Sequence, residues 1–396
     1  MLAETVARPP EARDARMAAP TRPVRLLVLT AYPRLAASTR YRIGQYLPAL
    51  SASGIECRTR AFLTDAAFKR LYAPDGWMTP TRDVLAGAVR SAAVIMKDLV
   101  WADVVWIERE AAPLGPPVLE WIATRLLKRS TILDLDDALY ARVGEAGGSP
   151  VYGEWLSALK CHWKTNRTIH WASHVVAGNT EIANHVRSIR GNRDVTFIPT
   201  AIDTKTFCPR TGAAYEGPLT IGWLGSHSAS KFLDMLVPVF EELGRRFHFV
   251  VVLVGAGRPF KIDGVEVESR GWELEREVRD LQSFDIGVYP LHHTQTGLAK
   301  SGFKAIQYMA AGVPFVASPV GIVRDLVDHG REGYLAETQV QWVEYLTRLL
   351  ADPSSRAAMG RCGREKAVRS FDNSHYVPDI ANLVTTLRPA TLARTS

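Results

Sequence analysis

The sequence alternates twice between short apolar runs and segments with helical periodicity. In the first half, the runs with the character of buried strands are 24–30, 103–107, 131–135, 174–177 and 195–198. In the second half they are 219–224, 247–254, 265–268, 286–289 and 315–317. Apolar runs that alternate with helices are typical of parallel sheets buried on both faces. The pattern therefore predicts an α/β protein with two doubly wound parallel sheets, one in each of two Rossmann-like domains.

A segment without periodicity, 199–217, separates the two series and is rich in turn residues. The expected parts are a disordered leader (1–23), an N-terminal Rossmann-like domain (24–200), a linker (201–217), a second domain (218–371), and a C-terminal helix that packs back on the first domain, with a tail (372–396). The leader lacks the apolar stretch of a secretory signal. In doubly wound sheets, ligands bind at the carboxyl ends of the strands, so the sequence predicts a site between the two domains.

Composition limits the cellular context and the partners. The 396 residues contain four cysteines, which are far apart and form no Cys-x-x-Cys pair. This usage argues against a disulfide framework or a zinc site and predicts a reducing cytoplasm. The net charge of +7 indicates either an anionic partner, such as a phosphate donor or the inner face of a membrane, or arginines dispersed over a solvated surface. Without a block of basic residues or an RNA-recognition signature, nucleic acid is not expected as a partner.

The loop after the run 219–224 is the first candidate ligand site. It reads Ile-Gly-Trp-Leu-Gly-Ser-His-Ser and contains Gly222, Gly225 and Ser226. Glycine lets the backbone approach a ligand closely, and free N–H groups at the start of the next helix favour a phosphate. The loop matches neither the Walker pattern nor the dinucleotide Gly-x-Gly-x-x-Gly pattern. The alternative is an ordinary strand-to-helix turn capped by serine.

The segment 297–321 is the second candidate. If it is helical, Lys300, Lys304 and Gln307 share one face, because they are spaced by four and three residues. Two lysines near a helix N-terminus are unfavourable unless an anion is bound there. The alternative is a solvated helix face. The following Ala-Ala-Gly-Val-Pro-Phe-Val-Ala-Ser predicts a strand packed tightly on the helix, which places the helix start at the ligand edge of the sheet.

This segment resembles one family. Family 4 glycosyltransferases of the GT-B fold carry Glu-Ala-Met-Ala-x-Gly-x-Pro-Val-Val-Ala-Ser where this chain has Gln-Tyr-Met-Ala-Ala-Gly-Val-Pro-Phe-Val-Ala-Ser at 307–318. The chain is most similar to a branch that reads Lys-x-x-x-Lys-x-x-Gln-Tyr-Met-Ala with a Gly-Trp-x-Gly-Ser loop. Further positions that resemble the family are Ala177-Gly178-Asn179, Ile198-Pro199-Thr200 with Asp203, Val254-Gly255, Asp285-Ile286-Gly287, and His329-Gly330 with Gly333-Tyr334.

The resemblance implies a nucleotide-sugar site in the second domain. It places Gly222, Gly225, Ser226, Lys300 and Lys304 around the donor diphosphate, with Gln307 on the ribose. Lys300 and Lys304 are then the catalytic candidates, because their charge stabilises the departing diphosphate. The chain departs from the family pattern where two glutamates usually stand seven residues apart. Their positions are taken by Ala299 and Gln307; glutamine can bind ribose hydroxyls, whereas alanine cannot hold a sugar.

Charged residues also follow the strands of the first half. Asp134, Asp136 and Asp137 end a predicted strand, as do the metal-binding Asp-x-Asp motifs of GT-A transferases. Because the donor diphosphate is assigned to the other domain, a structural or acceptor-facing role is favoured over a metal site. Arg40, Arg42 and Arg109 can each orient an acceptor or a phosphate, or simply pair with a carboxylate. The acceptor-side candidates are Arg40, Arg42, Arg109, Glu110, Asp136, Asp137 and Asn179.

Two histidine pairs are of interest. His170 and His174 are four residues apart, but the chain is expected to leave its helix between them, which argues against a metal pair. His292 and His293 follow a predicted strand near the donor site and are candidates for a donor contact.

The resemblance implies transfer of a sugar from a nucleotide diphosphate to an acceptor hydroxyl, with retention at the anomeric carbon. The donor is a co-substrate, and neither a cofactor nor a metal is expected. The acceptor is a glycan, a lipid-linked sugar or a small molecule, in the cytoplasm or at the inner face of the membrane. Two alternatives remain: an epimerase or hydrolase of the same architecture, and a non-catalytic sugar-nucleotide-binding subunit, which Ala299 favours.

Overall fold

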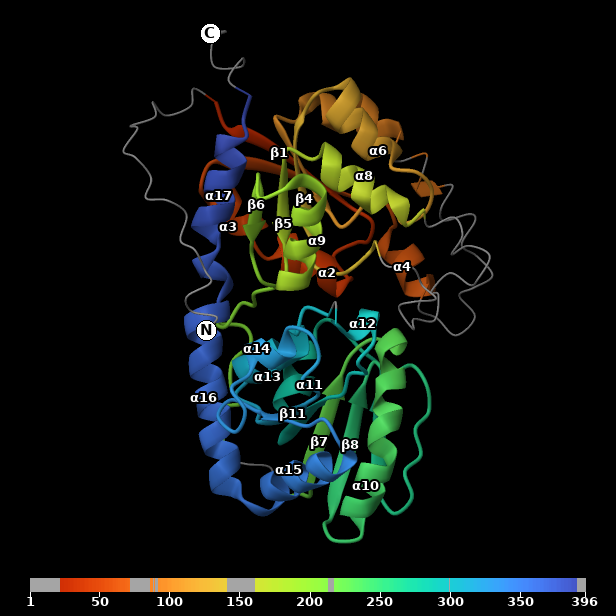
Figure 1. Cartoon of the computed structure of the whole chain (residues 1–396), viewed down its shortest axis with the longest axis vertical. Helices are drawn as coiled ribbons and strands as arrows, with labels where there is room; N and C mark the ends of the chain where they lie inside the picture. Colours follow the sequence, from red (N-terminus) through yellow and green to blue (C-terminus); the bar gives the residue numbers. More distant parts are fainter. Residues whose placement is uncertain are drawn as a thin grey trace. The chain divides into compact units, whose positions relative to one another are not determined.

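The computed structural model describes residues 22–71, 86–87, 89, 92–140, 161–212, 217–298 and 300–389. The described residues form two compact units: unit 1 contains those up to 199 and those from 376 on, and unit 2 contains 200–375. Each unit is an α/β layer structure in which helices cover a sheet (Figure 1). The predictions for the leader up to residue 21, for 141–160, for Ala299 and for the tail from 390 lie outside the described residues.

The sheet of unit 1 has six parallel strands in the order β2-β1-β3-β4-β5-β6. Their bounds are β1 Val24–Thr30, β2 Ile55–Ala61, β3 Val104–Glu108, β4 Ser130–Leu135, β5 His174–Ala177 and β6 Val195–Phe197. The strand order reverses between β1 and β3, where Thr30 lies opposite Glu108. Glu108 lies in turn opposite Asp134 on β4, so polar residues meet at the carboxyl edge of the sheet.

Two helical layers enclose this sheet. The helices and helical turns of unit 1 are α2 Ala37–Thr39, η1 Arg40–Gly44, α3 Leu47–Ala52, α4 Asp65–Leu71, η3 Ile95–Leu99, α6 Val118–Trp121, η4 Ile122–Leu126, α8 Trp163–Trp171, α9 Thr180–Arg190 and α17 Val377–Thr386. The helices α6, α8 and α9 pack on one face through residues such as Leu119, Ile169 and Ile182. On the other face, Leu50 of α3 and Ile380 of α17 share a core with β1.

The sheet of unit 2 also has six parallel strands, in the order β12-β11-β10-β7-β8-β9. Their bounds are β7 Leu219–Leu224, β8 Phe249–Val254, β9 Glu266–Arg270, β10 Ile286–Tyr289, β11 Phe315–Ala317 and β12 Tyr334–Leu335. The first strand of this unit, β7, lies beside β10, so the order reverses between them. Such a switch point is the usual ligand site of an open α/β sheet.

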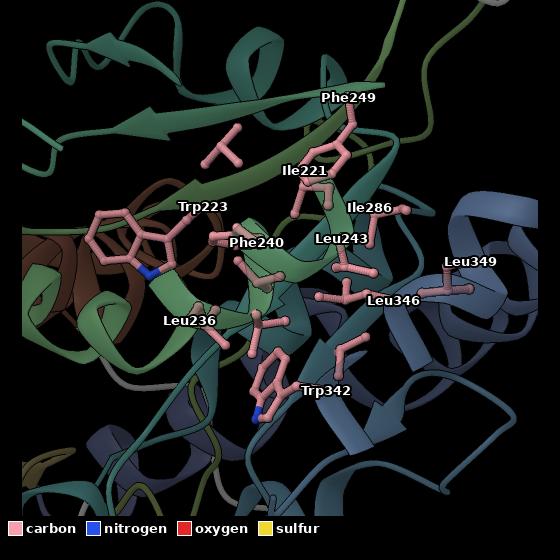
Figure 2. Packing of buried hydrophobic residues seen from close by; sticks show 14 of the residues in the cluster. Ile221, Trp223, Leu236, Phe240, Leu243, Phe249, Ile286, Trp342, Leu346 and Leu349 are labelled. Atoms are coloured by element: carbon pink, nitrogen blue, oxygen red, sulfur yellow. The ribbon is translucent and has the colours of Figure 1, made fainter. Parts of the chain in front are cut away.

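Helices and helical turns accompany the sheet of unit 2, and several of them pack on it. Their bounds are η6 His227–Leu236, α10 Val237–Gly244, α11 Glu277–Gln282, α12 Gln295–Leu298, α13 Phe303–Ala310, α14 Val323–Leu326, α15 Gln339–Ala351, α16 Pro353–Phe371 and η7 Asn373–His375. Figure 2 shows the core in which Phe240 of α10 and Trp342 of α15 pack around Ile221 and Trp223 of β7. Because this core anchors the sheet, it fixes the positions of the strand ends at which the candidate site lies.

The predicted fold class is confirmed, and three local predictions are corrected. The sequence pattern missed the edge strand β2 and a further edge strand, β12. The helical spacing of Ile43, Leu47 and Leu50 predicts a single helix from about Thr39, but the structure has α2, a π-helical turn and α3 there. The helix α3 begins one residue before Pro48. Lys300 was expected on one helix with Lys304, but α13 begins only at Phe303. Gly302 before it has φ 68°, and this left-handed conformation ends any continuous helix from Lys300.

The part of the predicted linker that the structure describes belongs to unit 2 and contacts its C-terminal end. Ile202 forms a bridge with Asp372, and the backbone N–H of Thr204 donates to Asp372 Oδ2 at 3.3 Å. The guanidinium of Arg364 donates to the carbonyl oxygens of Thr204 and Phe207, both at 2.8 Å. Residues 200–212 are therefore held by α16 and the turn that follows it.

Candidate functional site

The β7 strand ends in a loop that touches the loop after β8. The backbone N–H of Gly225 donates to Val254 O at 3.0 Å, and the ring Nδ1 of His227 lies 3.2 Å from Ala256 O. A Cβ on Gly255, which has φ 76°, would lie 2.2 Å from the carbonyl oxygen of Gly225. The two loops are therefore in backbone contact, and glycine is required for it.

The two glycines of the predicted loop have different surroundings. Gly222 lies inside β7, where a Cβ would be 2.0 Å from the ring of Phe284. Gly225 lies at the strand end, where a Cβ would be 2.5 Å from the Trp223 ring and 2.9 Å from Lys304 Cε. Both glycines thus allow close packing, Gly222 against Phe284 and Gly225 against Trp223 and Lys304. Ser226 is exposed and precedes η6.

Lys304 reaches the switch point from the first turn of α13. Its Nζ lies 5.5 Å from the ring centroid of Trp223 on β7 and 5.3 Å from that of Tyr289 on β10. The ammonium group is therefore held between two aromatic rings, an arrangement that stabilises a cation. Within the part of the chain that the structure describes, no carboxylate forms an ion pair with Lys304.

The charge of Lys300 acts on two other lysines of unit 2, Lys304 and Lys231. Burial, together with the nearby charge of Lys300, lowers the pKa of Lys304 to about 8. Burial and Lys300 also lower the pKa of Lys231, on η6. Ammonium groups whose charge is disfavoured by burial and by a neighbouring lysine, as in Lys304 and Lys231, gain from a bound anion. Although Lys300 is not on α13, its charge acts on Lys304.

Gln307 is buried on α13, and its side-chain Nε2 donates to Glu277 Oε1 of α11 at 3.3 Å. The next residue, Tyr308, donates its hydroxyl to Gly222 O and Val288 O, which ties α13 to β7 and β10. His292 and His293 are exposed after β10, and the ring of His292 lies edge-on to Phe232 at 5.4 Å. These residues surround the same strand ends as Lys304.

In unit 1, the predicted acceptor-side arginines are paired with the predicted acidic cluster. Arg42 Nε donates to Asp134 Oδ1 at 3.0 Å, and its Nη1 donates to Ile198 O at 2.8 Å. Arg109 donates from Nε and Nη2 to the two carboxylate oxygens of Asp136, at 2.6 and 3.1 Å. The carboxyl groups of the cluster are therefore largely neutralised by arginine.

The remaining acceptor-side candidates also have structural partners. Glu110 pairs with Lys164 Nζ at 2.9 Å, and Arg40 donates to Leu35 O at 2.7 Å. Asn179 caps α9, because its Oδ1 accepts from the N–H of Ile182 at 2.8 Å. Asp137, with 27% of its side chain exposed, lies 3.7 Å from Arg109 Nη2. Of the carboxylates near Arg109, it offers the largest exposed surface to a ligand.

Glu108 is a central residue that the sequence reasoning missed. It is fully buried at the switch point of unit 1, and its Oε2 accepts from Thr39 Oγ1 at 3.0 Å. Its Oε1 has no hydrogen-bond donor and lies 3.4 Å from Arg109 Nε. Burial raises the pKa of Glu108 to about 7, against the opposing effect of Arg109. In the sequence, Glu108 directly follows the predicted strand 103–107, and only its charge pointed to a functional role.

The structure also shows where the residues of the two metal sites considered from the sequence lie. The pairs with Arg42 and Arg109 account for Asp134 and Asp136, and the residues that the structure describes contain no group of three or more potential metal ligands. His170 lies on α8, which ends at Trp171, and His174 begins β5, where its Nε2 lies 2.8 Å from Thr196 Oγ1. The two rings therefore do not share a helix face, as the sequence predicted.

A family model described as Glycosyl transferases group 1 matches residues 218–352. The match spans β7 to the end of α15 and includes Gly225, Lys300, Lys304 and Gln307. Unit 2 therefore carries a glycosyltransferase domain. No curated protein sequence matches the chain.

Solved structures resemble the whole chain. Sucrose-phosphate synthase from Thermosynechococcus elongatus has a TM-score of 0.69 at 16% identity, covering 92% of this chain and 99% of that chain. Anabaena HepE in complex with UDP and glucose has a TM-score of 0.63 at 14% identity, covering 91% and 99%. The lipopolysaccharide outer core galactosyltransferase WaaB has a TM-score of 0.57 at 13% identity, covering 92% and 99%. The fold is thus the GT-B architecture.

Proposed function

We propose that the chain transfers a sugar from a nucleoside diphosphate donor to an acceptor hydroxyl. The observation that carries the proposal is Lys304, a half-buried cation between Trp223 and Tyr289 at the switch point of a glycosyltransferase domain. The structure of HepE contains UDP and glucose, which makes UDP-sugars the first donors to test. Biosynthesis of a glycan or a glycosylated metabolite is the proposed setting.

The proposed role of Lys304 is to stabilise the negative charge that grows on the diphosphate as it leaves. Lys300 adds charge at the same place, and the exposed loop that begins at Ser226 is proposed to offer backbone N–H groups at the start of η6. One such preorganised donor typically contributes about 3 kcal/mol to transition-state stabilisation. Gln307 is the proposed ribose contact, with its amide oriented by Glu277.

Metal independence and retention are further parts of the proposal. The lysines supply the positive charge that a divalent cation would otherwise bring to the diphosphate. For retention, the acceptor hydroxyl attacks from the side of the leaving group, and a leaving phosphate oxygen takes its proton. The bond from the anomeric carbon to phosphate breaks, and the bond to the acceptor oxygen forms on the same face.

Unit 1 is the proposed acceptor side. Arg109 and Asp137 are partly exposed at its carboxyl strand edge, with 20% and 27% of their side chains accessible. A carboxylate held beside an arginine can accept hydrogen bonds from sugar hydroxyls, so the acceptor proposed is a glycan, a lipid-linked sugar or a hydroxylated small molecule. We also propose that the protein acts in the cytoplasm at an anionic membrane surface, because the chain carries a net charge of +7.

The test is release of a nucleoside diphosphate from a panel of UDP-, GDP-, ADP- and dTDP-sugars, with EDTA and with Mg²⁺. Candidate acceptors are added, and the anomeric configuration of any product is read by NMR. We expect one donor to be consumed in EDTA, with its configuration retained. Turnover only with Mg²⁺, or an inverted product, would contradict the corresponding part of the proposal.

A matched pair of lysine variants assigns the site. Lys304→Met should lose donor turnover and binding of the nucleoside diphosphate. Lys261→Met removes a lysine whose side chain is 93% exposed elsewhere in unit 2 and should behave like the wild type. Equal activity of the two variants would remove Lys304 from the donor site.

A further inference from the structure

Two neighbouring helical segments of unit 1 expose large apolar side chains. On α6 and the following turn η4, Val118, Trp121 and Leu126 are 52%, 47% and 61% exposed. On α8, Trp163 is 54% exposed. Isolated surface apolar residues are common, but two half-exposed tryptophans on adjacent helices are not required by the core of this unit.

These segments form one layer. The helix α6 packs against α8, and both contribute to the core on the same face of the sheet through Leu119 and Ile169 (Figure 1). The guanidinium of Arg125 lies 5.9 Å from the ring of Trp171 on α8, which links the two outer surfaces directly. The exposed side chains therefore lie on two adjacent helical segments that cover the same face of the sheet.

The charges of this surface have one sign. Arg125, Lys128 and Arg167 are exposed on it. In the described segments 118–129 and 163–171, the single acid is Glu120, which is buried and accepts from the N–H of Ala111 at 2.8 Å. A protein surface that mixes tryptophan, leucine and basic residues without exposed acids is complementary to an anionic, amphipathic partner.

We propose that this surface docks on a membrane that contains anionic lipid headgroups. The surface, called here the basic-apolar face, consists of Trp121, Arg125, Leu126, Lys128, Trp163 and Arg167. Tryptophan rings favour the headgroup level of a bilayer, and arginine and lysine bind the lipid phosphates around them. Within the described residues no helix has the length and apolar content to cross a membrane, so the contact is a surface one.

The proposed function includes a membrane contact, and the basic-apolar face locates that contact on unit 1. It does not depend on the donor site in unit 2. It also narrows the acceptor: an enzyme held at the headgroup level is suited to an acceptor that is itself lipid-linked. Failure of one proposal can be told from failure of the other, because nucleotide binding and vesicle binding are measured separately.

The test is co-sedimentation of the full chain with vesicles of phosphatidylglycerol and phosphatidylcholine in equal amounts, and with vesicles of phosphatidylcholine alone. We expect binding to the anionic vesicles, little binding to the neutral ones, and a decrease at 0.5 M salt, where screening is strong. The double variant Trp121→Glu with Trp163→Glu should bind the anionic vesicles at least about tenfold more weakly.

The control is Val340→Glu, at a 75% exposed position on α15 of unit 2, which should bind as the wild type does. Thermal stabilisation by UDP should persist in every variant, which shows that a loss of vesicle binding is not a loss of folding. The proposal is overturned if the wild type binds neither kind of vesicle, or if the double variant binds the anionic vesicles as well as the wild type. Self-association of the wild type that the double variant abolishes, without vesicle binding, would assign the face to a second copy instead.

Discussion

The two units carry opposite charge arrangements at corresponding places in their sheets. At the β1–β3 switch point of unit 1, the buried acid Glu108 lies among ion pairs that neutralise one another, Arg109 with Asp136 and Arg42 with Asp134. At the β7–β10 switch point of unit 2, Lys304 is held by aromatic rings instead of a carboxylate. The buried charges of these ion pairs in unit 1 have partners within the protein, whereas the cation in unit 2 gains from an added anion.

We interpret this difference as one between a structural network in unit 1 and the proposed ligand site in unit 2. Charges that satisfy one another inside a fold chiefly specify its geometry, and removing one partner leaves a buried charge. A buried cation with aromatic neighbours and a lowered pKa is a candidate ligand site. Substitutions in unit 1 should therefore act first on stability, and those around Lys304 first on donor binding.

The largest effect is expected from Arg42→Met. Its guanidinium and the carboxylate of Asp134 are 2% and 1% exposed, so the variant leaves a buried, uncompensated carboxylate. The free energy of unfolding should fall by about 3 to 5 kcal/mol. Urea denaturation measures the change, with Arg167→Met, at an exposed position, as the control expected to cost little. An unchanged midpoint for Arg42→Met would show that the network does not hold unit 1 together.

The second-largest effect is expected from Lys304→Met, which should lower donor turnover and not stability. We expect donor turnover to fall by about 10² to 10³, as for the loss of one preorganised donor to a developing charge. Stability should be retained or increased, because methionine removes a buried ammonium and keeps the apolar stem between Trp223 and Tyr289. Initial rates and thermal melts of the same preparation check both statements. A strongly destabilised variant would make Lys304 structural, like Arg42.

Glu108→Gln should change how stability depends on pH. The unfolded carboxyl ionises near its ordinary pKa of 4.5, and the folded one at a pKa of about 7, because burial disfavours the charge. Between these values the folded state binds more protons than the unfolded state, so wild-type stability falls as pH rises from about 4.5 to 7. The variant should lack this loss, which amounts to about 2 to 3 kcal/mol.

Denaturation of both proteins at pH 5 and pH 7.5 measures this difference. The variant keeps an oxygen for the bond from Thr39, so its fold should be preserved. If wild type and variant lose stability in parallel over this range, the switch point of unit 1 does not titrate as described.

The smallest effect is expected from Asn179→Ala. The side chain caps α9, and loss of an N-cap costs about 1 kcal/mol. Asn179→Asp keeps an acceptor for the Ile182 N–H and should recover most of that stability. An acceptor KM that rises in Asn179→Asp, while the melting temperature recovers, would give Asn179 a binding role beyond its cap.

The sequence predicted the fold well because the strands are apolar runs buried on both faces, as in Phe249–Val254. It missed β2, Ile55–Ala61, where charged residues interrupt the run. That strand lies at the sheet edge, where burial on both faces is not required. The apolar signal therefore located the interior strands of the sheet better than its edges.

The site was predicted less completely, for reasons of geometry. Helical spacing suggested that Lys300 and Lys304 share a helix, but the left-handed Gly302 cannot be read from spacing. Trp223 and Tyr289 looked like core residues, and only the pairing of β7 with β10 brings them to Lys304. Likewise, the partner of Arg109 is set by the register of β3 with β4, which places residues 26 apart in sequence side by side.

The most direct measurement is calorimetric titration of UDP into the wild type and into Lys304→Met, in EDTA, at pH 7 and again at pH 9.5. We predict metal-free binding to the wild type at pH 7 and weaker binding at pH 9.5, which is above the pKa of about 8 of Lys304. The variant should show no pH effect of this size. Equal affinities of the two proteins at pH 7, or binding that appears only when Mg²⁺ is added, would contradict a donor site centred on Lys304.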